Sequence, residues 1–275
     1  MENDMNILME IAEKTKERVE KQKLEVSEDE IKALAKEAMK KQEKKEVFYH
    51  ALRGEGIQCI CEVKKASPSK GIIAEEFPYV EIAKDYETGG ASAISVLTEP
   101  FYFFGSNEYL KEIRKNVSLP ILRKDFTVDD YQIYEAKVLG ADACLLIVSL
   151  MSEECLKHRL ELAHSLNLSA LVETHDEKEV EIALRAGAKI LGVNNRNLKD
   201  FSVDVQNSSR LRKSVPPEVV FVSESGISNV EQVKALKQQG VDAVLVGEML
   251  MRAKDRVEAV KNIKTAGIGK QERKW

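Results

Sequence analysis

Apolar, strand-like runs that end in charged side chains recur along this 275-residue chain, roughly every 50 to 60 residues. A repeat of this length can hold two strand–helix units. Charge at the end of a strand is costly to bury without a partner, and α/β folds bind ligands at the carboxyl ends of their strands. Charged side chains that recur at the ends of successive strands therefore predict a shared ligand site. The side chains concerned are Glu62, Lys64, Lys124, Glu173 and Glu224.

A second series of strand starts alternates with the first, and each begins with Gly followed by a small or β-branched residue. A Gly at this place suits the end of a helix, where φ is often positive. The two series together predict eight strands that start near residues 57, 91, 119, 142, 168, 189, 219 and 242. Eight parallel strands with crossover helices in ~220 residues predict a (β/α)8 TIM barrel. The alternative, a doubly wound open sheet, more typically carries G-x-G-x-x-G after its first strand, and this chain does not.

The first 47 residues differ from the rest, because they are rich in Lys and Glu and carry no strand pattern. Apolar residues at helical spacing, and a capping box formed by Ser27 and Glu30, predict two amphipathic helices. We therefore expect an N-terminal helical extension over residues 1–47, packed on a barrel domain over residues 48–265. Residues 266–275 are expected to form a flexible tail.

Composition excludes several classes of protein. The content of 43% hydrophobic and 32% charged residues suits a globular core, and a net charge of −4 gives no reason to expect nucleic acid or an anionic membrane as partner. We expect neither a secretory signal nor a membrane helix. Four cysteines without zinc-ligand spacing indicate reduced thiols in a cytoplasmic protein. The four histidines share no ligand spacing, so no metal is expected.

The period of two along a strand places the charges on common faces. In the first strand Glu62 and Lys64 point the same way, and each of Lys124, Glu173 and Glu224 shares a face with an apolar residue two positions earlier. These side chains come from alternate strands, which fill one layer of a barrel. We therefore expect them to converge at the top of the barrel, where a mixed cluster of Lys and Glu can hold one group as an acid and another as a base.

Glycine-containing loops follow the last two strands. Ser225 and Gly226 open a helix after the seventh strand, and Gly247 follows the eighth. Loops at these two places, with a helix N-terminus, form the usual phosphate site of this fold. The loop around Ser67 follows the first strand and can add a hydroxyl group. Asn194 and Arg196 after the sixth strand suit hydrogen bonds to a hydroxylated substrate, and Phe103 after the second strand suits an apolar wall.

Five segments resemble the motifs of the indole-3-glycerol phosphate synthase family and occur in the family's order. They cover residues 62–69, 122–126, 171–175, 192–198 and 223–227. The resemblance runs from about residue 3 to 265 and includes the N-terminal extension. It implies a carboxy-lyase that converts 1-(2-carboxyphenylamino)-1-deoxyribulose 5-phosphate to indole-3-glycerol phosphate, carbon dioxide and water in tryptophan biosynthesis, without metal or organic cofactor.

The resemblance also implies a role for each residue. Lys124 is the general acid on the substrate's keto oxygen, Glu173 assists the loss of the hydroxyl group, and Lys64 meets the substrate carboxylate. The other implied roles are orientation of the lysines by Glu62 and Glu224, substrate contacts from Asn194, Arg196, Ser225 and Phe103, and phosphate contacts from Ser67, Gly226 and Gly247.

One position departs from the family. Some members carry Ser after the glycine of the eighth strand, whereas this chain carries Glu248. A carboxylate aimed at phosphate would repel it, so we expect only backbone contact there, with the side chain turned away. Two alternatives stay open at this point: a barrel that binds a sugar phosphate without turning it over, and an aldolase that forms a Schiff base on Lys124 or Lys64. The protein is expected to be a monomer.

Overall fold

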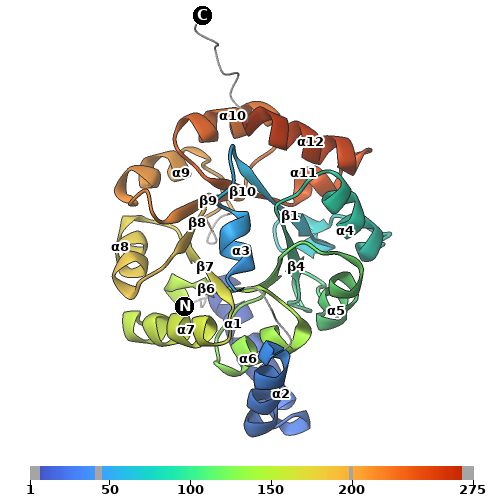
Figure 1. Cartoon of the computed structure of the whole chain (residues 1–275), viewed down its shortest axis with the longest axis vertical. Coiled ribbons are helices and arrows are strands. Elements are labelled where there is room, and N and C mark those ends of the chain that lie inside the picture. The colour runs from blue at the N-terminus through green and yellow to red at the C-terminus, as the bar shows by residue number, and fades with distance from the viewer. Residues whose placement is uncertain (1–6, 41–44, 198–200, 268–275) are drawn as a thin grey trace, which may run out of the picture.

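Eight parallel strands close into a barrel in the computed structural model, which describes residues 7–40, 45–197 and 201–267. The hydrogen-bonded order around the barrel is β1-β10-β9-β8-β7-β6-β5-β4 (Figure 1). The predicted (β/α)8 barrel is thereby confirmed. The barrel strands are β1 (Gln58–Val63), β4 (Ala93–Leu97), β5 (Ile121–Lys124), β6 (Ala143–Ile147), β7 (Ser169–Thr174), β8 (Ile190–Asn194), β9 (Val220–Glu224) and β10 (Ala243–Val246). A short antiparallel pair, β2 (Ala66–Ser67) and β3 (Gly71–Ile72), lies in the loop after β1.

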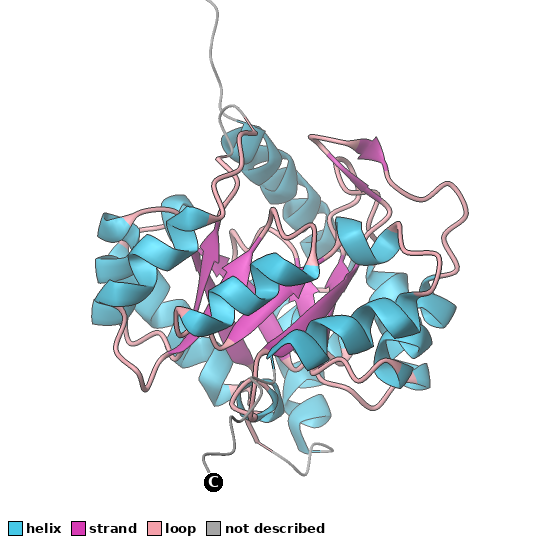
Figure 2. Cartoon of the chain, turned by 90° about the horizontal axis from the view of Figure 1, so that it is seen from above, coloured by secondary structure: helices cyan, strands magenta, loops and turns pink. Residues whose placement is uncertain are grey.

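Helices form a ring around the strands (Figure 1), and in the view turned by 90° they lie in front of and beside the strands (Figure 2). Those that follow barrel strands are α4 (Tyr79–Thr88), α5 (Asn107–Asn116), α6 (Tyr131–Leu139), α7 (Glu153–Ser165), α8 (Glu177–Ala186), α9 (Gln206–Leu211), α10 (Val230–Gln238), α11 (Glu248–Met251) and α12 (Arg256–Gly267), with short 3-10 turns at Val148–Leu150 and Arg212–Ser214. Side-chain caps fix where several begin: Asp176 accepts a hydrogen bond from the Glu179 N–H at the start of α8, and Asn229 accepts one from Gln232 at α10.

The period of two along each strand produces two separate cores. On β1, Cys59, Cys61 and Val63 face outward and pack with the surrounding helices. Ile60 faces inward with apolar residues of the other strands, such as Leu122 and Leu171. The barrel interior is therefore packed with apolar side chains, which fill it below the level where the charged strand ends emerge.

Three helices precede the barrel: α1 (Ile7–Glu25), α2 (Glu28–Lys40) and α3 (Val47–Ala51). Leu8 and Ile11 of α1 join the inner core at one end of the barrel, and Phe48 of α3 also joins that core. Figure 1 shows α3 in front of the barrel, α1 behind it and α2 projecting from it. Two N-terminal helices are present as predicted, whereas the division at residue 47 stays a prediction.

The predicted tail lies mostly outside the described residues, because α12 runs to Gly267. None of the described helices is long and apolar enough to cross a membrane.

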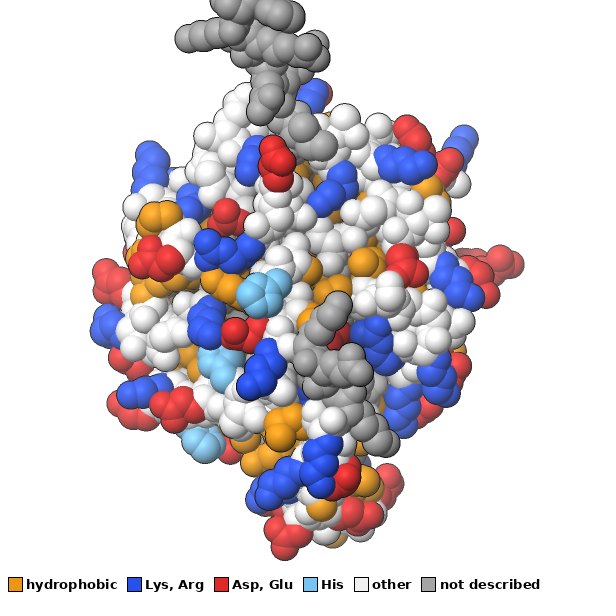
Figure 3. All heavy atoms as spheres, viewed as in Figure 1, with side chains coloured by type: hydrophobic (Ala, Val, Ile, Leu, Met, Phe, Trp, Pro, Cys, Tyr) orange, Lys and Arg blue, Asp and Glu red, His pale blue; other side chains and the backbone are white. Residues whose placement is uncertain are grey.

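The four cysteines are free thiols, and Cys59 and Cys61 place their sulfur atoms 3.4 Å apart. Basic and acidic side chains lie interspersed on the face that carries α3 (Figure 3). The expected monomeric state and cytoplasmic location stay predictions.

Candidate active site

A cavity of about 760 Å³ opens at the carboxyl ends of the barrel strands, which we call the mouth. Twelve residues singled out in the sequence all line it. They are Glu62, Lys64, Ser67, Phe103, Lys124, Glu173, Asn194, Arg196, Glu224, Ser225, Gly226 and Gly247. The fold thus brings together residues that lie up to 185 positions apart, from Glu62 to Gly247. Their chemical roles stay predictions.

Lys124 lies at the centre of the charged cluster. Its Nζ is 3.2 Å from Glu173 Oε2 and 3.6 Å from Glu224 Oε2. Burial alone would lower the pKa of this ammonium group, but the acidic side chains around it, with ionised Glu173 the strongest, outweigh burial and raise it above its ordinary value. Lys124 is therefore a cation at neutral pH.

The two carboxyl groups beside Lys124 titrate in opposite directions. Burial raises the pKa of Glu173, but Lys124 and the nearby His175 more than offset it, so the net pKa lies below the ordinary value. Burial also raises the pKa of Glu224, and its carboxylate neighbours add to the effect, which brings it to about 8 in spite of Lys124. One carboxyl group is therefore ionised and the other carries a proton at neutral pH, an arrangement that suits acid–base chemistry.

Asn194 fixes the orientation of Glu173. Its side-chain amide donates to Glu173 Oε1 at 3.0 Å, and its amide oxygen accepts a hydrogen bond from the Arg196 N–H at 3.0 Å. Both the NH2 group and the oxygen of the amide therefore have partners, and this defines which end of the amide points at the Glu173 carboxylate. Arg196 in turn donates to the Phe201 carbonyl at 3.2 Å.

A second ion pair lies across the mouth, where Lys64 Nζ is 2.6 Å from Glu62 Oε1. Gly247 leaves the room for this pair. A Cβ atom at Gly247 would lie 2.5 Å from Glu62 Oε1 and 2.9 Å from Lys64 Nζ. Gly247, which is predicted to contact phosphate, is therefore also needed to leave space for the Glu62 and Lys64 side chains.

The loop after β9 has an unusual backbone. Ser225 and Gly226 both have positive φ, 67° and 79°, which is uncommon for Ser. A Cβ atom at Gly226 would collide with Val203. Lys70, Ser228 and Arg252 also line the mouth, so that two further cations are available there. Glu248 lines the cavity too, where Arg252 Nε donates to its carboxylate at 3.1 Å and offsets its charge.

No group of His, Cys, Asp and Glu among the described residues is arranged to hold a metal ion. The candidate site therefore consists of ion-paired Lys and Glu side chains, an amide, a guanidinium group, glycine-bearing loops and apolar walls.

Comparison with known proteins decides the family. The family model described as indole-3-glycerol phosphate synthase matches residues 8–263. The chain belongs to the indole-3-glycerol phosphate synthase family.

Curated relatives carry the same name. The protein from Ruminiclostridium cellulolyticum is 54% identical over 249 residues, which cover 90% of this chain and 95% of the relative. The protein from Lachnoclostridium phytofermentans is 50% identical, covering 94% and 99%. Among solved structures, thiamine phosphate pyrophosphorylase from Pyrococcus furiosus superimposes with a TM-score of 0.59 at 20% identity, covering 76% of this chain and 95% of that one. That likeness concerns the fold alone.

In this member of the indole-3-glycerol phosphate synthase family, a buried carboxylate orders the loop that carries the apolar wall of the mouth. Glu99 is fully buried and accepts backbone hydrogen bonds from Phe101, Tyr102 and Phe103 at 2.7 to 3.0 Å. The turn that it organises carries the Phe103 ring to within 6.0 Å of the Phe126 ring, measured between centroids. The sequence predicts a place for Phe103 at the site but not the function of Glu99, because a Glu after a strand looks the same in sequence whether it lines a site or folds inward.

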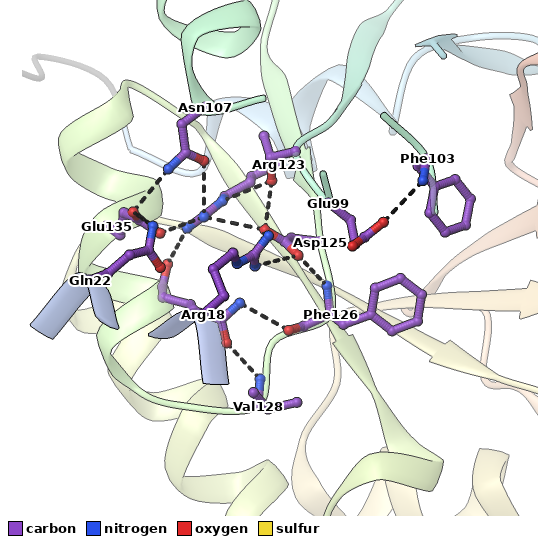
Figure 4. A network of polar contacts seen from close by, with 12 residues as sticks. Arg18, Gln22, Glu99, Phe103, Asn107, Arg123, Asp125, Phe126, Val128 and Glu135 are labelled. Atoms are coloured by element: carbon purple, nitrogen blue, oxygen red, sulfur yellow. Dashed lines mark hydrogen bonds and ion pairs between the residues drawn. The ribbon is translucent and has the colours of Figure 1, made fainter. Parts of the chain in front are cut away.

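The N-terminal helix of this family member is tied to the residue after Lys124. Arg18 of α1 donates to both carboxylate oxygens of Asp125 at 2.8 and 2.9 Å (Figure 4). Asp125 also accepts from Thr98 and Arg123, and Arg123 continues the network to Glu135. Through this connection α1 places further apolar side chains at the mouth, namely Ile7, Leu8 and Ile11. The sequence pattern predicts that the extension packs on the barrel, but not that it lines the site.

Proposed function

We propose that this protein is an indole-3-glycerol phosphate synthase, a lyase that closes the indole ring of a phosphorylated anthranilate–ribulose substrate with loss of carbon dioxide and water. The observation that carries the proposal is Lys124, a cation held by two carboxyl groups of different protonation at the floor of one mouth. Family membership supplies the substrate, 1-(2-carboxyphenylamino)-1-deoxyribulose 5-phosphate.

The charges and walls of the mouth suggest how the substrate lies. Its phosphate is placed at the loops of Ser225, Gly226 and Gly247, with Ser67 adding a hydroxyl group and Lys70 and Arg252 nearby. Its carboxylate is placed at Lys64, and its aromatic ring packs against Phe103. Asn194 and Arg196 lie where they can contact the ribulose hydroxyl groups.

Ring closure uses Lys124 as the acid. The ring carbon that bears the carboxylate forms a bond to the keto carbon, and Lys124 gives a proton to the keto oxygen, which becomes a hydroxyl group. A cation is required for this step, and the raised pKa of Lys124 keeps it charged at neutral pH. The same raised pKa argues against a Schiff base on Lys124, because only the neutral amine is a nucleophile.

Two losses complete the reaction. Carbon dioxide leaves, and the electron pair of the broken bond restores the aromatic ring. The hydroxyl group then leaves as water with a second proton, which Lys64, the lysine paired with Glu62 in the mouth, donates, while ionised Glu173 takes a proton from the adjacent ring carbon. Two protons are given to oxygen and one is removed from carbon, so each turnover takes up one proton.

The test mixes purified protein with this substrate in the presence of a chelator and follows indole fluorescence and proton uptake. We expect indole-3-glycerol phosphate, one proton consumed per product, and no covalent adduct after borohydride treatment. Binding of the substrate without product would contradict the proposal and favour a barrel that only binds a sugar phosphate. A trapped adduct would favour the Schiff-base alternative.

A further inference from the structure

His175 follows β7 directly and is held from one side by the first turn of α8. Its Nδ1 lies 3.1 Å from Glu179 Oε2, and its backbone N–H donates to the same oxygen at 2.7 Å. Asn207 of α9 donates to the His175 carbonyl at 2.9 Å. These contacts fix the ring at the edge of the candidate site, with a side chain that is only 20% exposed.

The other ring nitrogen faces the candidate base. His175 Nε2 lies 3.7 Å from Glu173 Oε1 and is a buried nitrogen without a hydrogen-bond partner. The imidazole therefore stands between two carboxylates, Glu179 on α8 and Glu173 on β7. Glu224 on β9 is a third acidic group that acts on it from across the barrel.

A second cavity of about 480 Å³ lies on the far side of this ring. His175 and Glu179 line it together with Asn194, which also lines the mouth. The charged groups across this cavity are Asp176, Asp204, Arg196 and Arg210. Two of these groups are acidic and two are basic. The charged groups nearest the imidazole are therefore Glu179 and Glu173, with Lys124 on the other carboxylate oxygen of Glu173.

We propose that His175 is a positioning residue for Glu173: Glu179 holds the ring as an imidazolium whose Nε2 faces Glu173, and this cation keeps Glu173 ionised and aimed into the mouth. The inference rests on the proposed function, in which Glu173 takes a proton from the ring carbon. His175 is not among the residues that line the mouth, so its effect on the reaction passes through Glu173.

Electrostatics support this reading. Burial alone would lower the pKa of His175, but the hydrogen bond to Glu179 and the charges of Glu173 and Glu179 raise it above its ordinary value. The other cation beside Glu173 is Lys124, which gives up its proton in ring closure. His175 is then the positive charge that remains beside Glu173 when Glu173 has to act as a base.

The test compares the pH dependence of turnover in the native protein and in His175→Asn and His175→Gln, with His158→Asn as the matched control. His158 is 61% exposed and pairs with Asp130 on the outer surface. We expect both His175 variants to move the acid limb of the kcat profile to higher pH, with kcat about tenfold lower at pH 6 and changed by less than about threefold at pH 8. The control variant keeps the native profile. A native profile in both His175 variants would overturn the proposal.

A second measurement does not depend on turnover or on the stability of those variants. The imidazole of His175 is titrated by NMR in the native protein and in Glu173→Gln. We expect the pKa of His175 to be lower in Glu173→Gln, and an unchanged titration would overturn the proposal. If the native protein makes no product, the proposed function fails by itself, while the titration still reports whether the two side chains are coupled.

Discussion

Glu224 is the residue whose chemistry depends most on its surroundings. Its Oε1 is buried without a hydrogen-bond partner, and Oε2 faces Lys124. Room for this side chain comes from Gly192 on the adjacent strand β8, since a Cβ atom there would collide with Glu224 Oε1. A glycine inside a strand often marks such a close approach, but the sequence does not tell which neighbour requires it.

Replacing Glu224 by Gln tests its protonation through stability. Burial raises the pKa of Glu224 from 4.5 to about 8, so the folded protein holds a proton that the unfolded chain releases in between. The stability that this group contributes is present below pH 4.5 and is lost as pH rises through about 8. We expect the native free energy of unfolding to fall over this interval more steeply than that of Glu224→Gln, as measured by urea unfolding at a series of pH values. Parallel curves would contradict the assignment.

Replacing Gly192 by Ala tests the close approach. The added methyl group has to displace Glu224 or the Leu171 side chain, which we expect to cost about 1–3 kcal/mol of stability. The double variant Gly192→Ala, Glu224→Ala removes the carboxylate that the methyl group meets. If the collision is the cause, the two stability changes measured by urea unfolding are not additive. Additive changes would show that Glu224 is not the group displaced.

At the scale of single residues, the sequence predicts the twelve that line the mouth, because strand ends and period two assign them to one place. It does not predict the functions of Glu99, Gly192 or His175. Each function depends on a contact that only the folded chain makes. Glu99 accepts hydrogen bonds from three backbone N–H groups, Gly192 leaves room for Glu224 on the next strand, and His175 faces Glu173.

At the scale of elements, the strands begin within about two residues of their predicted starts. Four of them follow a glycine and a small residue at the end of a helix, and the other four are apolar runs that end in charge, so both signals have a local cause. Helix caps are predictable for the same reason. The N-cap of α8 is Asp176 and that of α10 is Asn229, both residue types that favour this position. The short elements β2, β3 and α11 have no periodic signal of their own, and their presence follows from the loops of the site.

Removing the charge of Glu99 should loosen the loop between β4 and α5. In Glu99→Gln, one acceptor oxygen becomes a donor that faces backbone N–H groups, so we expect a loss of about 2 kcal/mol in stability. Because the turn carries Phe103, KM should rise more than kcat falls, as steady-state kinetics can measure. Glu108→Gln is the matched control, since its side chain is 66% exposed and pairs only with Lys111 on the same helix. Equal KM values in the two variants would contradict the role of Glu99.

Removing Arg18 should detach α1 from the residue that follows Lys124. Asp125 is only 2% exposed, so Arg18→Met leaves a buried carboxylate with one fewer cation and should cost about 2–3 kcal/mol of stability. Lys16→Met is the control on the same helix, because Lys16 is 55% exposed and pairs with Glu13. Urea unfolding measures both. A loss in Arg18→Met no larger than in Lys16→Met would show that the ion pair does not anchor the helix.

At the scale of the whole molecule, the residues that stabilise the barrel and the residues proposed for the reaction lie in different places. Apolar side chains fill its interior, while charges gather only where the strands end. Helix α1 adds apolar residues to the mouth, the loops after β9 and β10 add glycines, and Lys70 and Arg252 add cations. The substrate is therefore expected to lie across the barrel axis, between an apolar wall and a phosphate site, with Lys124 beneath its keto group.

The most direct test of this account is the single-turnover rate of Lys124→Met with saturating substrate, measured by indole fluorescence beside Lys84→Met, which changes an exposed lysine of α4. We expect the rate of Lys124→Met to fall by about 10³-fold or more, with a substrate Kd within about tenfold of native, because general acid catalysis contributes on the order of 10² to 10⁴-fold. The control keeps the native rate. A Lys124→Met variant that forms product at close to the native rate would contradict the account.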